Sequence, residues 1–334
     1  MLRRVAPREE LMSIAADTNV LGEALQRLAR GNRIDLAGLL TDVEVHTQIE
    51  NTKVIFHFHC LKLDGNGRPR IRDLVQAVCD NVLDFAIPRS AINTAKAKMN
   101  ASGSTAEIMR LGREARSLFT DLTQSGEGGE LLLFVMAEQL LQLPQLICKM
   151  SLKTNSRMHV HGADGLHAGV DPLSGKLLLY WGESKIYEVA SDAIRECLAS
   201  LAPMIKTQAS TRDLQLLQRF ADVDNPEMEE ALKRFLDPRT EISTSLEFRG
   251  LCLVGFDCEH YPTDAGVGTL TEVVEAMKTL PPELKKQICK RIREEKLEPF
   301  GLHFLCVPFP SSEDFRKKMR EELLNVYGVV DGSA

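Results

Sequence analysis

The stretch that decides the fold is DGLHAGVDPLSGKLLLYWGESK, residues 164–185. Two segments with strand character, 166–170 and 177–187, lie on either side of residues 171–176. Those six residues are Asp, Pro, Leu, Ser, Gly and Lys, and tight turns favour Asp, Pro, Ser and Gly. The pattern therefore predicts an antiparallel β-hairpin centred on this turn.

In an antiparallel hairpin, the start of the first strand lies beside the end of the second. We therefore expect Asp164 to lie next to Glu183 and Lys185. Side chains alternate between the two faces of a strand, so Glu183 and Lys185 should point the same way, and Ser184 the opposite way. The sequence thus predicts that two carboxylates and one ammonium group converge at one corner of the hairpin.

Carboxylate oxygens are ligands of hard cations, and we expect Asp164 and Glu183 to bind Mg²⁺, with Mn²⁺ as an alternative. Such a metal polarises a phosphoryl oxygen and lowers the pKa of a bound water, while Lys185 can orient that water or offset developing charge. The D…E-x-K arrangement is typical of restriction-endonuclease-like PD-(D/E)xK nucleases. An exposed strand can also carry Glu and Lys two apart as a simple ion pair. Here they end the apolar run 177–181, where unused charge is costly.

A second acid competes with Asp164 for the metal-binding role. Asp171 precedes a proline, but it falls in the turn, at the end of the hairpin far from Glu183. A histidine near Asp164 could hydrogen-bond a phosphate or a metal ligand, or it could simply pack inside a strand. The sequence leaves both roles open for His159, His161 and His167.

Two other patterns resemble binding motifs but are incomplete. His57 and His59 have the spacing of half a zinc site, but no second ligand pair follows at metal spacing. Gly65 and Gly67 belong to a turn, because no Walker lysine follows them. No nucleotide-hydrolysis motif occurs elsewhere, so energy for movement along DNA would have to come from another chain.

The rest of the chain alternates helical and strand patterns, which predicts an α/β fold with helical additions. Helices are expected over about 9–40, 71–97 with an interruption at Pro88, 130–141, 190–206, 211–238, 270–296 with a partial break at Pro281 and Pro282, and 311–326. Strands are expected over 53–64, 157–161, 248–260 and 300–309. The last strand–helix–strand succession predicts a parallel crossover. We expect an N-terminal helical region 1–50, a PD-(D/E)xK-like core 51–210 and a C-terminal α/β region 211–334.

The composition is that of an ordinary globular protein. The chain has 334 residues, and its 41 basic and 47 acidic residues give a net charge of −6, which disfavours DNA binding by bulk electrostatic attraction. Its eight cysteines form no CxxC pair, and several lie in apolar runs, which predicts reduced thiols and a cytoplasmic protein. No apolar run approaches the roughly 18 residues of a membrane helix, and no signal peptide is apparent, so we expect no membrane partner.

Several segments match a known family. They are GELLL at 129–133, Pro144, KM at 149–150, KTN at 153–155, HVHGADGLH at 159–167 and YWGESK at 180–185. Together they resemble the HamA-type nucleases of Hachiman-like, two-gene anti-phage systems, of which the AbpA subunit of a related helicase-paired system is another member. The resemblance is dense over about 128–187, weaker at CVPFPS (306–311), and missing before residue 50.

The resemblance implies a restriction-endonuclease-like core, metal-dependent DNA cleavage, and a superfamily-2 helicase as partner in a heteromeric complex. It places metal-binding acids at Asp164 and Glu183 and the catalytic lysine at Lys185. It also adds Glu130, from the preceding helix, as a further catalytic and metal-binding acid. The residue before Asp164 is Ala163 rather than the proline of the motif's name, and that proline is commonly absent.

Two alternatives stand beside the helicase-paired nuclease. One is a non-catalytic subunit that anchors or regulates a helicase, which the loss of an acid or of the lysine would favour. The other is a nuclease that works alone in restriction or repair, which the acidic tail without a DNA-reading motif disfavours. For a partner helicase, we expect docking at the acidic segment 222–230 and the basic helix face 285–293.

Overall fold

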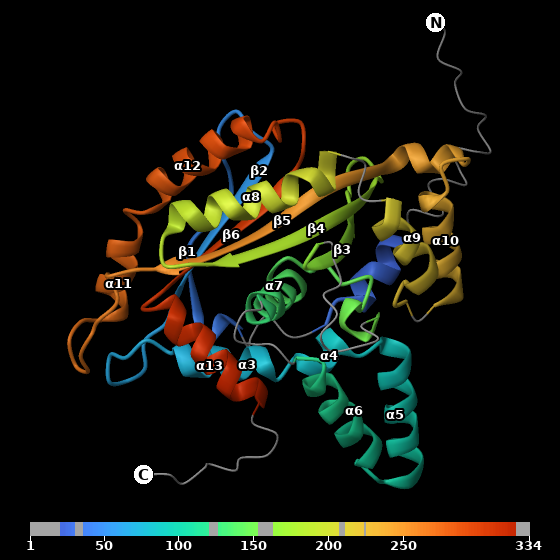
Figure 1. The fold of residues 1–334 in the computed structure, drawn as a ribbon, viewed down its shortest axis with the longest axis horizontal. Coiled ribbons are helices and arrows are strands. Elements are labelled where there is room, and N and C mark those ends of the chain that lie inside the picture. Colours follow the sequence, from blue (N-terminus) through green and yellow to red (C-terminus); the bar gives the residue numbers. More distant parts are fainter. Residues whose placement is uncertain are drawn as a thin grey trace, which may run out of the picture.

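The computed structural model describes residues 21–30, 36–119, 126–152, 163–206, 211–223 and 225–324. Its centre is a six-stranded sheet with the order β1-β2-β6-β5-β4-β3 (Figure 1). The strands are β1 (Leu40–Gln48), β2 (Val54–Leu61), β3 (Gly165–Val170), β4 (Leu177–Ile186), β5 (Leu246–Asp257) and β6 (Leu302–Phe309). The four inner strands run parallel, and the edge strands β1 and β3 run antiparallel to their neighbours. This mixed sheet with its helices confirms the expected α/β class.

Helices cover both faces of the sheet (Figure 1). On one face, α8 (Ala190–Lys206) packs on β4 and β5, with α12 (Pro281–Glu294) beside it. The other face carries α7 (Glu127–Leu140), and α3 (Ile71–Cys79) and α13 (Ser312–Leu324) pack against that helix. Crossovers between parallel strands have one hand. From β4 to β5 to β6 the chain moves across the sheet in one direction, so the connecting helices lie on one face. From β2 to β4 the chain moves across the sheet in the opposite direction, so its helices lie on the other face.

Further elements connect those of the two faces. They are the helices α4 (Val82–Ala86), α5 (Arg89–Ser102), α6 (Ala106–Ser117), α9 (Thr211–Phe220), α10 (Pro226–Leu236) and α11 (Leu270–Met277), and the 3-10 turns η1 (Lys149–Leu152) and η2 (Glu241–Ser245). Within the described residues, no helix combines the length and apolarity that crossing a membrane requires. All eight cysteines are free thiols, and all but Cys289 are buried, which agrees with their expected packing as small apolar side chains.

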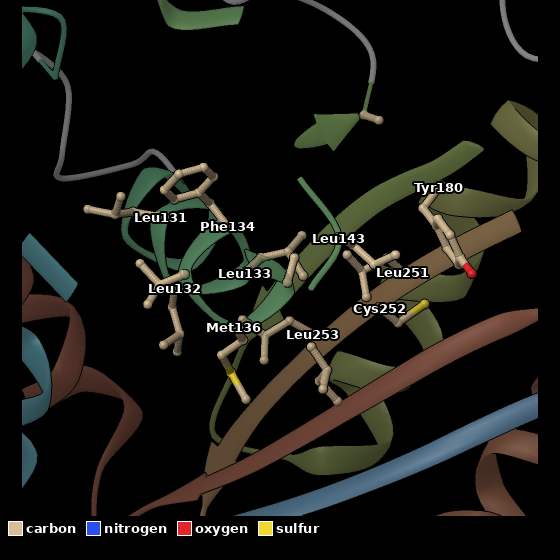
Figure 2. Close-up of a cluster of buried hydrophobic side chains, with 14 of the residues drawn as sticks. Leu131, Leu132, Leu133, Phe134, Met136, Leu143, Tyr180, Leu251, Cys252 and Leu253 are labelled. Atoms are coloured by element: carbon tan, nitrogen blue, oxygen red, sulfur yellow. The ribbon is translucent and has the colours of Figure 1, made fainter. Parts of the chain in front are cut away.

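Helix α7 is buried on nearly all sides, as its continuous apolar run predicts. Every residue from 131 to 139 is buried. Figure 2 shows Leu133 and Met136 on the side of α7 that faces Leu251 and Leu253 of β5. The helix is therefore clamped between the sheet and the outer helices, which holds its first turn in a defined position against β4.

Most expected elements are confirmed, including the hairpin strands, the helix 190–206 and the parallel pairing of β5 with β6. The segment 71–86 is divided into α3 and α4. The interruption expected at Pro88 is confirmed, because Ile87, which precedes it, has extended geometry and α5 begins at Arg89. A proline disfavours helical geometry in the residue before it, which explains this break. The expected strand 157–161 lies outside the described residues.

Strand β1 was not among the expected elements, and it lies in the region 1–50 that we expected to be helical. In the described part of that region, residues 21–28 are helical and residues 40–48 are a strand. The β1–β2 register shifts between Asp42 and Glu44 and again between Glu44 and Thr47. Such bulges interrupt the two-residue period by which a strand is found in a sequence, and the edge position leaves much of β1 exposed.

The sheet does not divide at residue 210. Strands β5 and β6 lie between β2 and β4. Strand β6 is hydrogen-bonded to β2, and β5 is hydrogen-bonded to β4. The expected regions 51–210 and 211–334 therefore share one sheet and one core. The reason is the parallel topology, because strands that are distant in sequence become neighbours when helical crossovers connect them.

Candidate active site

The β3–β4 hairpin brings the predicted corner together. Gly165 pairs with Gly182 across the ladder, so Asp164, just before β3, lies beside Glu183. The main-chain N–H of Asp164 donates to the Gly182 carbonyl oxygen at 2.8 Å. The register expected from the turn is therefore confirmed. We call Asp164, Glu183 and Lys185 the carboxylate corner.

Asp164 is fixed at the edge of the sheet by Ser184. Its Oδ2 atom accepts two hydrogen bonds from Ser184, one from the main-chain N–H at 2.8 Å and one from the hydroxyl at 2.7 Å. Because β3 begins only at Gly165, the Asp164 carboxylate takes the place of a main-chain acceptor that a longer strand would offer. Among the described residues, no hydrogen bond is donated to its other oxygen, Oδ1.

Glu183 and Lys185 extend from β4 toward α8, on the opposite face from Ser184. Lys185 Nζ lies 2.5 Å from Glu183 Oε1, and the side chain of Ser200 in α8 also hydrogen-bonds the Glu183 carboxylate. The Glu183 side chain is 5% exposed and the Lys185 side chain is 23% exposed. The carboxylate is therefore nearly enclosed, whereas the lysine reaches solvent.

The charges of the corner perturb one another. Burial, followed by the charge of Asp164, raises the pKa of Glu183 to about 7. Burial also raises the pKa of Asp164, against the opposing effect of the Ser184 hydrogen bonds and of Lys185. Burial disfavours the charged form of Lys185, but Glu183 outweighs it and holds the pKa of Lys185 above its usual value. Two carboxylates thus lie close together at low dielectric, which disfavours the ionisation of both at once.

The donor set of the corner fits a magnesium ion. Mg²⁺ keeps several waters and is commonly held by one or two carboxylates. Asp164 and Glu183 supply two, and a cation between them would relieve the repulsion that raises the pKa of Glu183. The described residues contain no group of three or more His, Cys, Asp or Glu side chains around one cation position. Water would therefore have to complete the coordination.

Glu130 belongs to α7, which packs on the other face of the sheet from Glu183 and Lys185. It lies in the first turn of α7 and is partly buried. The neighbouring Gly129 faces Ser184, because a Cβ atom added to Gly129 would lie 3.1 Å from Ser184 Oγ. The structure thus brings Asp164, Glu183 and Lys185 together, and it sets the helix of Glu130 against Ser184. The metal-binding role of Glu130 stays a prediction.

Two residues beside Asp164 were missed by reasoning from the sequence. Lys149 is buried and donates from Nζ to the Ala163 carbonyl oxygen at 2.9 Å, and its charge opposes the rise in the pKa of Asp164 that burial causes. Ser184 was expected only to point away from the two charged residues. Lys149 belongs to a segment shared with the resembling family, and that was the only signal for it. The hydrogen bonds of Ser184 depend on where β3 begins, which no local pattern reveals.

The rival acid and the nearby histidines have structural roles where they are described. Asp171 accepts hydrogen bonds from the Leu173 N–H at 3.0 Å and the Ser174 hydroxyl at 2.6 Å, at the far end of the hairpin. His167 is fully buried, its Nδ1 lies 2.9 Å from the Leu143 carbonyl oxygen, and burial lowers its pKa to about 4. His159 and His161 lie outside the described residues.

A second group of titratable side chains lies on the face of the sheet that carries α7. His57 Nε2 and His303 Nδ1 are 3.0 Å apart, and His59 Nδ1 is 2.8 Å from Asp42 Oδ1. Burial, with smaller effects of neighbouring charges, lowers the pKa of His57 to about 3 and that of His303 to about 4. Both imidazoles are therefore neutral at pH 7. We call His57, His59 and His303 the histidine cluster.

The two surfaces expected to dock a partner are less charged than their sequences indicate. In the acidic segment, Asp222 is buried and pairs with Arg89, with 3.1 Å between Oδ2 and Nη1. Asp224 lies outside the described residues. On α12, four basic side chains pair with glutamates, namely Lys285 with Glu44, Lys286 with Glu283, and Lys290 and Arg291 with Glu294.

Comparison with known families matches residues 38–323 to the HamA family. The matched residues cover most of the chain and include all six strands and the carboxylate corner. A search of curated proteins returned no match. The extent of the family match shows that the chain belongs to the HamA family of Hachiman-type anti-phage defence proteins.

Proposed function

We propose that this chain is a metal-dependent deoxyribonuclease that acts with a helicase in anti-phage defence. The observation that carries the proposal is the carboxylate corner, where Asp164 and Glu183 meet beside Lys185. The succession α7, β3, β4, α8, β5, with the two acids on neighbouring antiparallel strands, supports a restriction-endonuclease-like core. Membership of the HamA family supports the defence role.

In this proposal, Asp164 and Glu183 would hold Mg²⁺, with Glu130 as a further acid from α7. The bound ion would supply Lewis-acid stabilisation of the phosphodiester oxygens and lower the pKa of a coordinated water. Lys185 stays protonated at neutral pH because its pKa is raised. It would therefore stabilise negative charge on the phosphate rather than accept a proton. Its partial exposure gives a DNA backbone access to the ammonium group.

The DNA substrate and the helicase partner are inferred from the family resemblance and from the charge of the chain. With a net charge of −6, the isolated chain gains little from the release of counterions that drives non-specific DNA binding. A docked helicase would present a DNA strand at high effective concentration. Cleavage would then depend on the helicase engaging DNA, which ties it to abnormal ends or unwound tracts such as replicating phage DNA.

The nuclease proposal is tested by plasmid cleavage with the purified full-length chain in Mg²⁺. We expect EDTA to abolish cleavage and the variants Asp164→Ala, Glu183→Ala and Lys185→Ala to be inactive but folded, because each lacks a group needed for the proposed chemistry and the core of the sheet is unchanged. Asp171→Ala is the matched control, since it removes a carboxylate from the far end of the same hairpin. Undiminished cleavage by Glu183→Ala would contradict the assignment.

The partner proposal is tested by copurification with a helicase encoded beside this chain. A truncation after residue 210 cannot serve as the test, because it would remove the central strands β5 and β6. Surface variants of the full chain are suitable instead. The side chains to neutralise are exposed, namely Glu227, Glu229 and Glu230 in α10 and Lys286 and Lys290 in α12.

If these variants copurify as well as the wild type, the proposed docking surfaces are wrong. ATP should alter cleavage by the complex, and the isolated chain should cleave weakly and with strong salt dependence. A wild-type chain that binds the helicase but cleaves no DNA with either Mg²⁺ or Mn²⁺ would favour the non-catalytic alternative.

A further inference from the structure

We propose that Ser184 is a positioning residue that orients Asp164 for the metal. Because Gly129 of α7 has no side chain, it leaves room for the Ser184 hydroxyl. The inference rests on the proposed metal-dependent function and names how its site is assembled. Both hydrogen bonds from Ser184 end on one oxygen of Asp164, Oδ2, at 2.8 and 2.7 Å. The carboxylate is therefore held by one oxygen, and no donor among the described residues hydrogen-bonds Oδ1, the oxygen that would face a cation.

The geometry distinguishes this arrangement from ordinary strand pairing. A strand residue usually satisfies its N–H with a main-chain carbonyl of the neighbouring strand, and a serine hydroxyl on the sheet can bond any nearby acceptor. Here the main-chain N–H and the hydroxyl of Ser184 both approach the same side-chain oxygen. Two donors at different angles fix both the position and the rotation of the carboxylate, which a single hydrogen bond would not do.

Helix α7 sets the position of the hydroxyl. A Cβ atom at Gly129 would lie 3.1 Å from Ser184 Oγ, which is tighter than an ordinary contact, so a side chain at this position would require the hydroxyl or the helix to shift. The helix itself cannot move away easily, because residues 131–139 are buried against the sheet and the outer helices. The packing of α7 therefore affects the orientation of Asp164 through the Ser184 hydroxyl.

Groups that orient metal ligands in this way typically change metal affinity or activity about 10- to 100-fold when they are removed. We therefore expect Ser184→Ala to weaken Mn²⁺ binding by about tenfold and to raise the Mg²⁺ concentration for half-maximal cleavage by a similar factor. Ser184→Thr keeps a hydroxyl at a strand position that tolerates β-branching, and it should restore most of the affinity. Binding is measured by titration calorimetry with Mn²⁺ alone, without DNA.

The matched control is Ser174→Ala. The Ser174 hydroxyl donates to Asp171 at 2.6 Å, so it forms the same type of bond at the other end of the same hairpin. Removing it should leave Mn²⁺ binding unchanged. A comparable loss of affinity in Ser174→Ala and Ser184→Ala would show that the effect comes from the stability of the hairpin, and it would overturn the proposal.

Gly129→Ala provides a second, independent variant. Alanine is the better helix former, but its Cβ would push the Ser184 hydroxyl away from Asp164. We expect weaker Mn²⁺ binding by Gly129→Ala alone and no further loss when it is added to Ser184→Ala, because the hydroxyl is then already gone. Additive losses, or wild-type affinity in Ser184→Ala, would overturn the role of Ser184 while leaving the nuclease proposal intact. A wild-type chain that binds no Mn²⁺ and cleaves no DNA would overturn both.

Discussion

The carboxylate corner and the histidine cluster lie in one sheet and differ in how their titratable groups are satisfied. In the corner, burial and the neighbouring charge of Asp164 raise the pKa of Glu183 to about 7, although Lys185 lies beside it. In the cluster, burial lowers the pKa of His57 to about 3, and this imidazole pairs with neutral His303. The imidazoles of His57 and His303 are neutral at pH 7, whereas the two carboxylates of the corner repel each other when both are ionised. A pKa that is shifted by a close pair of like charges, in addition to burial, is typical of functional sites.

The largest expected difference between the two regions is in catalysis. Asp164→Asn should lower DNA cleavage by about a thousand-fold or more, because it removes a proposed metal ligand worth several kcal/mol of transition-state stabilisation. His57→Gln should cleave DNA at close to the wild-type rate. The measurement is the initial rate of plasmid cleavage at saturating Mg²⁺. A large loss in His57→Gln would show that the cluster takes part in function.

The next effect concerns stability above neutral pH. The pKa of Glu183 in the folded chain is raised from 4.5 to about 7, so the folded state binds more protons than the unfolded state between these values. Stability is therefore lost as the pH rises through about 7. In EDTA at pH 8, Glu183→Gln should be more stable than the wild type by up to about 3 kcal/mol. Urea denaturation measures this difference, and a less stable Glu183→Gln would refute the interpretation that the ionised Glu183 carboxylate destabilises the fold.

The histidine cluster should respond to pH with the opposite sign. His57 has a folded pKa of about 3, well below 6.5, so the unfolded state binds more protons in this range. Stability is present above pH 6.5 and is lost as the pH falls. At pH 5 the loss due to His57 is about 2 kcal/mol, which His57→Gln should remove. The check is urea denaturation of both chains at pH 7 and pH 5, and equal acid sensitivity would contradict the assignment.

The smallest effect is expected for the acid that lies outside both regions. Asp171→Ala removes two hydrogen bonds in an exposed turn, which should cost about 1 kcal/mol of stability and leave the cleavage rate unchanged. Thermal denaturation and plasmid cleavage together test this. An inactive Asp171→Ala would mean that the metal-binding acid lies at the turn and not beside Glu183.

Several features follow from the sequence alone because they are local. The turn chemistry at 171–176 and the alternation on either side determine the hairpin register, and that register places Asp164 beside Glu183. The uninterrupted apolar run of α7 predicts its burial, since no face of it could remain in water. The alternation of faces along β4 likewise predicts that Glu183 and Lys185 project together.

Other features were decided only by the tertiary structure. The two donors of Ser184 reach Asp164 because β3 starts where it does, and Lys149 of η1 lies near it because its ammonium group donates to the Ala163 carbonyl oxygen. Strands β5 and β6 enter the middle of the sheet, so the boundary expected near residue 210 does not divide it. The acidic and basic segments looked like open surfaces in the sequence, but Asp222 is buried and α12 is largely paired with glutamates.

The physical reason for this division is the range of the interactions. Turn propensity and side-chain periodicity act over a few residues, so the sequence determined the hairpin, its register and the convergence of Asp164, Glu183 and Lys185. The order of parallel strands, the bulges of β1 and the charges that face one another across helices depend on contacts between segments far apart in the chain. Only the packed fold could decide those, because burial and pairing are properties of the whole core and not of any one segment.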